Sequence, residues 1–191
     1  WYNSKGSLTD STFSYNNATR FGGAVYWSGA NGAVFNSKFI NNSAVQSGGA
    51  ICWNAANGTL KDSTFINNTA NNWGGGINWM GDNGTLKDST FKSNTASYGG
   101  GAAGWSGTNG SLTGSTFTNN TASASGGGVY YYITGSMVNC NFVNNKLTNH
   151  NKINGIYVHS NLIINGGKGI VNINNHGTLS GISIIVLNNE T

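Results

Sequence analysis

The sequence contains few charged residues, which limits the partners that it can bind through charge. Only 7% of its 191 residues are charged, and nine Lys and Arg against five Asp and Glu give a net charge of +4. The basic residues lie singly along the chain, and scattered lysines make a weak footprint for nucleic-acid binding. We therefore expect no nucleic-acid partner.

Proline and long apolar runs are also absent. The chain contains 30 Gly and many Asn, Ser and Thr residues, which are poor helix formers because glycine is too free and the small polar side chains bond to their own backbone. The longest aliphatic stretch runs from Ile184 to Leu187, which is too short to cross a membrane as a helix. These absences argue against a helical fold and predict no membrane insertion in this segment.

The residues that are present form a repeat of 26 positions, for example GTLKDSTFINNTANNWGGGINWMGDN. Copies begin at Gly6, Gly32, Gly58, Gly84, Gly110 and, one residue early, Gly135. This period is typical of stacked-repeat proteins, in which each rung packs on its neighbours and equivalent residues form columns along the axis. A rung is one circuit of the chain. We expect regular repeats over residues 1–145 and irregular C-terminal rungs of the same solenoid over residues 146–191.

Three columns keep a constant chemistry and are predicted to point into the solenoid. An aliphatic column contains Leu8, Val34, Leu60, Leu86, Leu112 and Met137. An aromatic column contains Phe13, Phe39, Phe65, Phe91, Phe117 and Phe142. A third column contains Asn16, Asn42, Asn68, Asn94, Asn120 and Asn145. Stacked asparagine amides hydrogen-bond to one another along an axis, so the third column predicts an internal ladder.

A fourth column of large aromatic residues follows a Gly-Gly step. Its members are Trp1, Trp27, Trp53, Trp79, Trp105 and Tyr131. One position earlier, the residue type varies freely, as Tyr26, Cys52, Asn78, Gly104 and Tyr130. A packed column restricts side-chain size, whereas a solvated column does not. We therefore predict that the tryptophan column points inward and that the variable column faces solvent.

Short strands in columns, without helical periodicity, predict an all-β fold: a right-handed, single-stranded parallel β-helix with about 26 residues and three short strands per rung. The main alternative is a leucine-rich repeat, because Leu60 to Asn68 resembles its strand signature. That fold needs a helical return segment, whereas here the return contains Gly-Gly and a β-rich strand. Cys52 and Cys140 lie more than three rungs apart, beyond the ~7 Å that a disulfide tolerates, so two free thiols are expected.

Two motifs carry a resemblance to known surface proteins. FxxN occurs as FINN at Phe39 and Phe65 and as FTNN at Phe117, and GGA precedes Val or Ile in the copies at Gly22 and Gly48. These motifs resemble the repeat of chlamydial polymorphic membrane proteins, and the chain is still more similar to adhesin-like proteins of methanogenic archaea with Asn-rich β-helix repeats. The resemblance covers Trp1 to about Asn145. It implies a surface-exposed stalk or adhesive module, at the cell surface or extracellular, and it transfers no catalytic residue.

Acidic residues are the only candidates for catalysis. Asp62 and Asp88 occupy one column in adjacent rungs, at the ~5 Å spacing that the two carboxylates of a retaining glycosidase require. Asn36 and Asn139 occupy the same column, however, which favours a turn-forming role. The alternative function is therefore a polysaccharide-degrading β-helix enzyme, a lyase or glycosidase. We predict no enzyme, no cofactor and no metal site.

Histidines and glycosylation sequons add little to this interpretation. The spacing of His150, His159 and His176 matches no metal-binding motif. Asn-x-Ser/Thr sequons occur at Asn17, Asn41, Asn57, Asn67, Asn83, Asn109, Asn119 and Asn189. Many such sequons arise by chance in an Asn- and Thr-rich chain, so whether any is modified stays open.

We predict that function lies where the repeat is not constant. The candidate ligand-binding residues are Trp73, Tyr98, Tyr26, Asn78, Tyr130 and Tyr132. Their aromatic rings are suited to stacking on sugars. The predicted function is a non-enzymatic segment of a cell-surface adhesin-like protein, with two alternatives left open. As an adhesive module it would bind glycans or surface proteins along a lateral face, and as a spacer it would only hold another domain away from the cell. Trp1 lies in the middle of a repeat, so we expect a piece of a longer protein, with possible end-to-end self-association through its open rungs.

Overall fold

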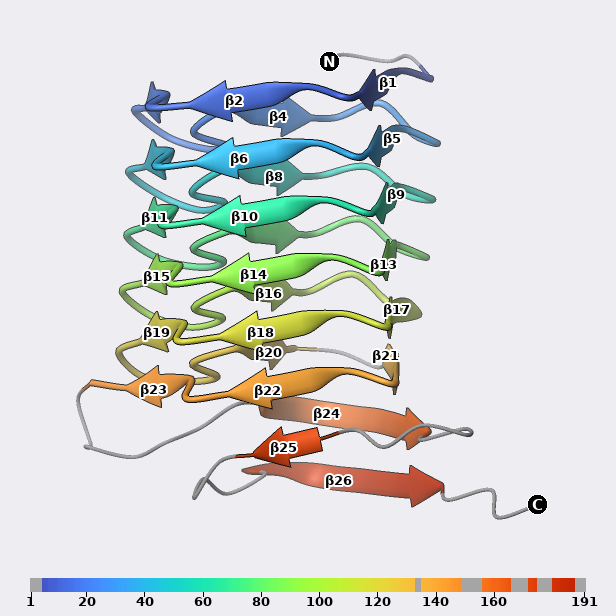
Figure 1. Cartoon of the computed structure of the whole chain (residues 1–191). Coiled ribbons are helices and arrows are strands. Elements are labelled where there is room, and N and C mark those ends of the chain that lie inside the picture. Colours follow the sequence, from blue (N-terminus) through green and yellow to red (C-terminus); the bar gives the residue numbers. More distant parts are fainter. Residues whose placement is uncertain (1–4, 133–134, 149–155, 166–171, 175–179, 188–191) are drawn as a thin grey trace.

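The computed structural model describes residues 5–132, 135–148, 156–165, 172–174 and 180–187. These residues form an all-β parallel solenoid with no helix, in which about 26 residues complete each rung (Figure 1). Five rungs, from β1 to β20, contain four strands each. The strands stack into four parallel faces, named here the first to the fourth face in the order in which the chain passes through them.

Strands of one face lie one repeat apart in the sequence. The first face contains β1 (Ser7–Thr9), β5 (Ala33–Phe35), β9 (Thr59–Lys61), β13 (Thr85–Lys87), β17 (Gly110–Thr113) and β21 (Gly135–Val138). The second contains β2 (Thr12–Ser14), β6 (Lys38–Ile40), β10 (Thr64–Ile66), β14 (Thr90–Lys92), β18 (Thr116–Thr118), β22 (Asn141–Val143) and β25 (Asn172–Asn174). The third contains β3 (Asn17–Ala18), β7 (Ser43–Ala44), β11 (Thr69–Ala70), β15 (Thr95–Ala96), β19 (Thr121–Ala122) and β23 (Lys146–Leu147). The fourth contains β4 (Val25–Trp27), β8 (Ile51–Trp53), β12 (Ile77–Trp79), β16 (Ala103–Trp105) and β20 (Val129–Tyr131).

Longer strands follow the regular rungs. β24 (Ile156–Asn165) pairs with both β20 and β21 and so joins the fourth face to the first. β26 (Ser180–Leu187) pairs with β24. The domain division between residues 145 and 146 stays a prediction. Among the histidines, His159 lies in β24, whereas His150 and His176 lie outside the described residues.

The coil is right-handed, as predicted. In Figure 1 the second-face strands, such as β10, run leftward at the front, the fainter fourth-face strands run rightward behind them, and the chain descends from its N-terminus. The prediction of three strands per rung is wrong by one strand. The two residues after the asparagine column, such as Thr69 and Ala70, form a strand of their own because equivalent residues of adjacent rungs pair in exact register.

Stacked aromatic rings fill the core. Trp79 lies between Trp53 and Trp105, with ring centroids 4.6 and 4.8 Å apart and planes within 3° of parallel. Phe65 stacks on Phe91 at 4.5 Å. All five rings are buried. The strand spacing of about 4.8 Å falls within the range preferred for aromatic pairs, so one register satisfies both the backbone and the rings. The inward tryptophan column is confirmed for the described residues; Trp1 lies outside them.

The asparagine column forms hydrogen bonds along the axis, as predicted. Asn68 donates from its side-chain amide to Asn94 Oδ1 and to the carbonyl of Phe39, both at 2.9 Å. Its own Oδ1 accepts from the backbone N–H and the side-chain amide of Asn42, at 2.9 and 3.0 Å. Each asparagine thus satisfies backbone groups at a corner where the sheet ladder is interrupted.

The Gly-Gly step before each fourth-face strand has a steric cause. Gly74 has a φ of +65°, in the left-handed region that glycine adopts at little cost. A Cβ on Gly75 would collide with the carbonyl oxygens of Gly101 and Thr95. The corner therefore brings two backbones so close together that no larger residue fits.

Candidate functional site

The fourth face carries the largest departure from the regular repeat. The corner before its strands contributes one further column, which consists of Phe21, Ser47, Trp73, Gly99 and Ser125. In register, Trp73 bridges to Gly99, and Gly99 bridges to Ser125. Trp73 is therefore the one large side chain in the middle of this column.

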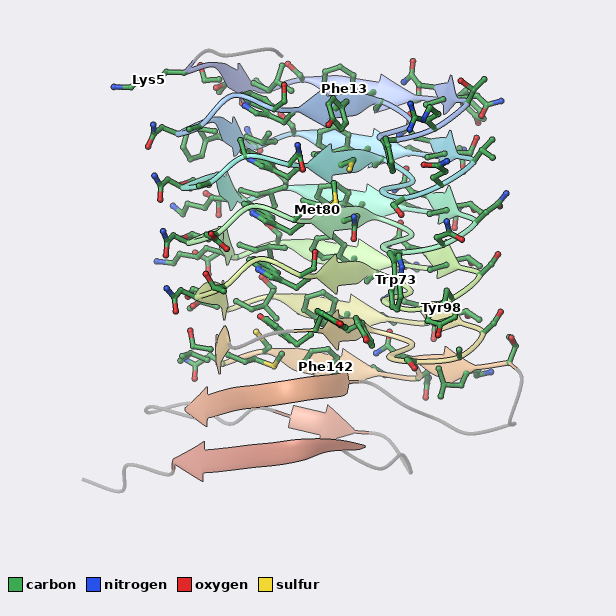
Figure 2. All side chains as sticks on the ribbon, turned by 180° about the vertical axis from the view of Figure 1, so that it is seen from behind. Lys5, Phe13, Trp73, Met80, Tyr98 and Phe142 are labelled. Atoms are coloured by element: carbon green, nitrogen blue, oxygen red, sulfur yellow. The ribbon has the colours of Figure 1, made fainter. Side chains whose placement is uncertain are left out.

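The Trp73 ring extends across the two rungs that follow its own. Its centroid lies 4.4 Å from that of Tyr98, edge to face, and 4.5 Å from that of Tyr130 at a tilt of 40°. Tyr130 belongs to β20, whereas Trp73 precedes β12, so one rung lies between them. That rung has Gly99 in the column of Trp73 and Gly104 in the column of Tyr130. A Cβ on Gly99 would collide with the Trp73 ring. Figure 2 shows Trp73 and Tyr98 beside each other on this face.

A groove with a volume of about 300 Å³ lies beside the Trp73 ring. Its lining consists of Ser47, Trp73, Asn78, Met80, Gly104, Trp105, Ser106, Tyr130 and Tyr132. Gly104 lies among these residues, and a Cβ on it would stand 3.0 Å from Asn78 Oδ1, 3.2 Å from the Gly74 nitrogen and 3.4 Å from Trp73 Cβ. Other rungs place Tyr, Cys or Asn at this position of the variable column, so the missing side chain leaves the room in which Trp73 crosses the rung. We call this groove the Gly104 groove.

The variable column is not solvated, and this prediction is wrong. Cys52 is fully buried, and Asn78 and Tyr130 are each only 6% exposed. Corner side chains pack against two members of the column: Phe21 lies 6.0 Å from Tyr26 and Trp73 lies 4.5 Å from Tyr130. Variation in this column therefore reflects what packs beside each residue, and not exposure to water.

The Gly104 groove brings together four of the six candidate residues: Trp73, Asn78, Tyr130 and Tyr132. Tyr98 is half exposed and contacts Trp73 from outside the groove. Tyr26 is distant, in the first rung, where it stacks on Phe21 at 6.0 Å. The candidate set did not include Gly104, Met80 and Ser106. The single glycine in a column of side chains could have indicated the hollow, and Met80 and Ser106 share a column with Tyr132.

The electrostatic character of the groove is neutral. None of its lining residues is acidic or basic. Beneath it, Asn78 hydrogen-bonds to Cys52. Burial raises the pKa of Cys52 from 9.0 to about 12, and the hydrogen bond from Asn78 offsets only part of that rise. The groove can therefore offer aromatic faces, hydroxyl groups and one amide, but no charge.

Both thiols are expected to stay protonated and unreactive in the folded chain. Cys52 and Cys140 are free and buried, and burial raises the pKa of each from 9.0 to about 12. Because the unfolded chain releases these protons at lower pH than the folded chain, the free energy of unfolding should fall as pH rises from about 9 towards 12. At pH 8 a thiol reagent such as DTNB should label neither cysteine until denaturant is added. Labelling of a thiol without denaturant would contradict this prediction.

The acidic pair lies elsewhere, at the corner between the first and second faces. Asp62 and Asp88 adopt φ values of 52° and 48°, and their column mates Asn36 and Asn139 share this conformation. Each aspartate is exposed and pairs with the preceding lysine, at 3.2 Å for Lys61 and 3.8 Å for Lys87. These residues are therefore turn formers. No cluster of three or more His, Cys, Asp or Glu suited to a metal ion occurs within the described ranges.

Every regular rung contains the same run: a positive-φ corner, a Phe that is buried in all rungs but the first, a ladder Asn, a glycine step and a fourth-face strand. Four copies of this run match a known repeat. Residues 10–26, 36–52, 62–78 and 114–131 match the Chlamydia polymorphic membrane protein (Chlamydia_PMP) repeat. In structural terms, each matched PMP repeat runs from the corner before the second face to the fourth face. Comparison with curated proteins and with solved structures finds no match.

The features of the PMP repeat in this chain have structural roles. Its Phe and Asn positions form the ring stack and the ladder, and its glycines allow two backbones to meet. The Gly104 groove instead depends on residues that vary between rungs. Within the part of the chain that the structure describes, no helix has the length and apolarity needed to span a bilayer.

Proposed function

We propose that this chain is a non-enzymatic segment of an adhesin-like cell-surface protein, in which a stiff solenoid presents the Gly104 groove to a ligand. The matched PMP repeats and the parallel solenoid support a surface role. The likeness of the repeats to adhesin-like proteins of methanogenic archaea belongs to this proposal. The ligand is a glycan or a surface protein that docks laterally.

The observation that carries the adhesive role is the aromatic surface beside the groove. Tyr98 and Tyr132 are 52% and 49% exposed in a chain whose other large rings are mostly stacked inside. Exposed aromatic residues are enriched at binding surfaces because they bury a large area with few rotatable bonds. Packing of the solenoid does not require these residues, since other rungs place Arg, Gln, Asn or Ala at the position of Tyr98 and Ser, Asn or Met at that of Tyr132.

The groove offers nothing that a lyase or glycosidase would use. Both enzymes need acidic or basic side chains beside the substrate. The lining residues are all uncharged, and Asp62 and Asp88 lie at a different corner. The uncharged groove therefore supports the adhesive function over an enzymatic one.

Beads coated with the 191-residue chain should be retained on intact cells and on immobilised glycans more strongly than uncoated beads. Trp73→Ala should lower retention about tenfold, as loss of one central aromatic contact typically does. Thr64→Ala, on the second face, is the matched control and should leave retention unchanged. Retention no better than that of uncoated beads would eliminate the adhesive role and leave only a spacer that holds another domain away from the cell.

A further inference from the structure

We infer that the Gly104 groove binds one uncharged pyranose ring, which stacks on the Trp73 wall and donates a hydroxyl hydrogen bond to Asn78. This inference rests on the proposed function, because it names the ligand class of the same site. Four properties of the groove lead to it: its size, its lack of charge, the arrangement of its rings and a buried acceptor.

The size of the groove selects a single ring. A volume of about 300 Å³ lies at the lower end of the range for ligand pockets. An extended polymer would therefore place only one residue inside and leave the rest along the face. The half-exposed rings of Tyr98 and Tyr132 flank the hollow, where neighbouring sugar residues would pass.

The lack of charge selects a neutral ligand. None of the lining side chains is ionised at neutral pH, so nothing would compensate a carboxylate, phosphate or ammonium group placed there. Burying an uncompensated charge costs far more than burying a hydroxyl group. Uronic acids, sialic acids and phosphorylated sugars are therefore poor candidates for the ring that occupies the hollow.

The rings form one contiguous aromatic wall and not a cage. Trp73 contacts Tyr130 at 4.5 Å with the ring planes 40° apart, and Tyr130 and Tyr132 lie 6.4 Å apart with their planes 28° apart. A quaternary ammonium group is held by separate aromatic faces that surround it. A pyranose instead presents one face of C–H groups, which packs on a wall of this kind.

A buried acceptor explains why the ligand should carry hydroxyl groups. Asn78 lines the groove, and its Oδ1 would lie 3.0 Å from a Cβ on Gly104. Asn78 is only 6% exposed, and its side chain hydrogen-bonds to Cys52 on the neighbouring rung. A wholly apolar ligand would cover the Oδ1 atom without offering it a donor, which is unfavourable. A sugar hydroxyl supplies that donor, and Ser106 adds a hydroxyl group at the same lining.

Titration of the 191-residue chain with methyl pyranosides tests the inference. The probes are the methyl glycosides of neutral hexoses and N-acetylhexosamines, with methyl glucuronide and choline as charged comparisons. Tryptophan fluorescence is a suitable readout, since Trp27, Trp53, Trp79 and Trp105 are buried and Trp73 lines the groove. At least one neutral pyranoside should bind with a Kd on the order of 1 mM, at least about tenfold tighter than either charged probe.

Three variants connect that binding to the groove. Trp73→Ala, Gly104→Ala and Asn78→Leu should each weaken it about tenfold or more, because they remove the wall, displace Asn78 or Trp73 and delete the acceptor. In Gly104→Ala the added methyl group would meet Asn78 Oδ1 at 3.0 Å, the Gly74 nitrogen at 3.2 Å and Trp73 Cβ at 3.4 Å, so these neighbours must shift slightly to accommodate it. Circular dichroism and thermal unfolding check each fold, and Thr64→Ala should bind as the unaltered chain does.

Tighter binding of methyl glucuronide or choline, binding unchanged in both Gly104→Ala and Asn78→Leu, or no response to any neutral pyranoside would each overturn the inference. If beads coated with the chain still adhered to cells in the last case, the proposed function would stand with a protein ligand. If pyranosides bound while coated beads failed to adhere, the sugar site would stand without the adhesive role.

Discussion

Replacing Trp79 by Ala is expected to lower the free energy of unfolding by about 3–5 kcal/mol, the typical cost of truncating a buried tryptophan. Trp79 is fully buried and stacked on both faces, against Trp53 at 4.6 Å and Trp105 at 4.8 Å. Its loss leaves a cavity that the neighbouring rungs cannot close, because their backbones are held in register by β12, β8 and β16. Urea unfolding followed by circular dichroism measures the change.

Trp79→Phe provides the matched comparison. The indole N–H of Trp79 is buried and has no hydrogen-bond partner, so phenylalanine removes ring volume without breaking a hydrogen bond. A six-membered ring also preserves part of the stack, as Tyr131 does below Trp105 at 5.7 Å. We expect a cost of about 1–2 kcal/mol, well below that of Ala. Equal losses for Phe and Ala would show that stacking is not the source of the stability.

Replacing Asn68 by Ala is expected to cost about 3 kcal/mol, since several buried polar groups lose their partners. Asn68 makes four hydrogen bonds with Asn42, Asn94 and the carbonyl of Phe39. After truncation the backbone N–H of Asn42 and the Phe39 carbonyl lose these bonds in a corner that excludes water. The same urea experiment, combined with amide hydrogen exchange, should show the loss centred on the second and third rungs.

Asn71→Ala controls for the loss of an asparagine as such. Asn71 is exposed and lies one residue beyond β11, outside the ladder. Its substitution should change the free energy of unfolding by no more than about 0.5 kcal/mol, as is usual at exposed sites. A cost for Asn68→Ala as small as that for Asn71→Ala would mean that the ladder contributes no stability.

The candidate site could be predicted only in part. Trp73 stands out in the sequence because its column mates are mostly small, and Tyr132 because other rungs place Ser, Asn or Met there. Tyr98 and Trp73 are both among the candidate residues, and their rings lie 4.4 Å apart. The groove itself was not predicted. A glycine in a strand usually indicates flexibility or close packing, whereas Gly104 leaves room for the neighbouring side chain of Trp73.

Burial of the variable column is the clearest case in which pattern and packing diverge. Asn78 and Tyr130 differ in size and polarity, which suggested contact with solvent. The neighbours of this column differ from rung to rung: Phe21 packs on Tyr26 within one rung, whereas Trp73 reaches Tyr130 across the rung that contains Gly104. A column constrains its members to one size only when every rung places the same neighbour beside it.

The sequence by itself determined the period, the right-handed parallel solenoid, the inward ring stacks, the asparagine ladder and the turn-forming aspartates. It could do so because each of these features repeats every 26 residues, and stacking makes equivalent positions into direct neighbours. Only the tertiary structure decided the fourth strand of each rung, the burial of the variable column and the Gly104 groove. These depend on contacts between unlike positions of successive rungs, and such contacts leave no periodic signal in the chain.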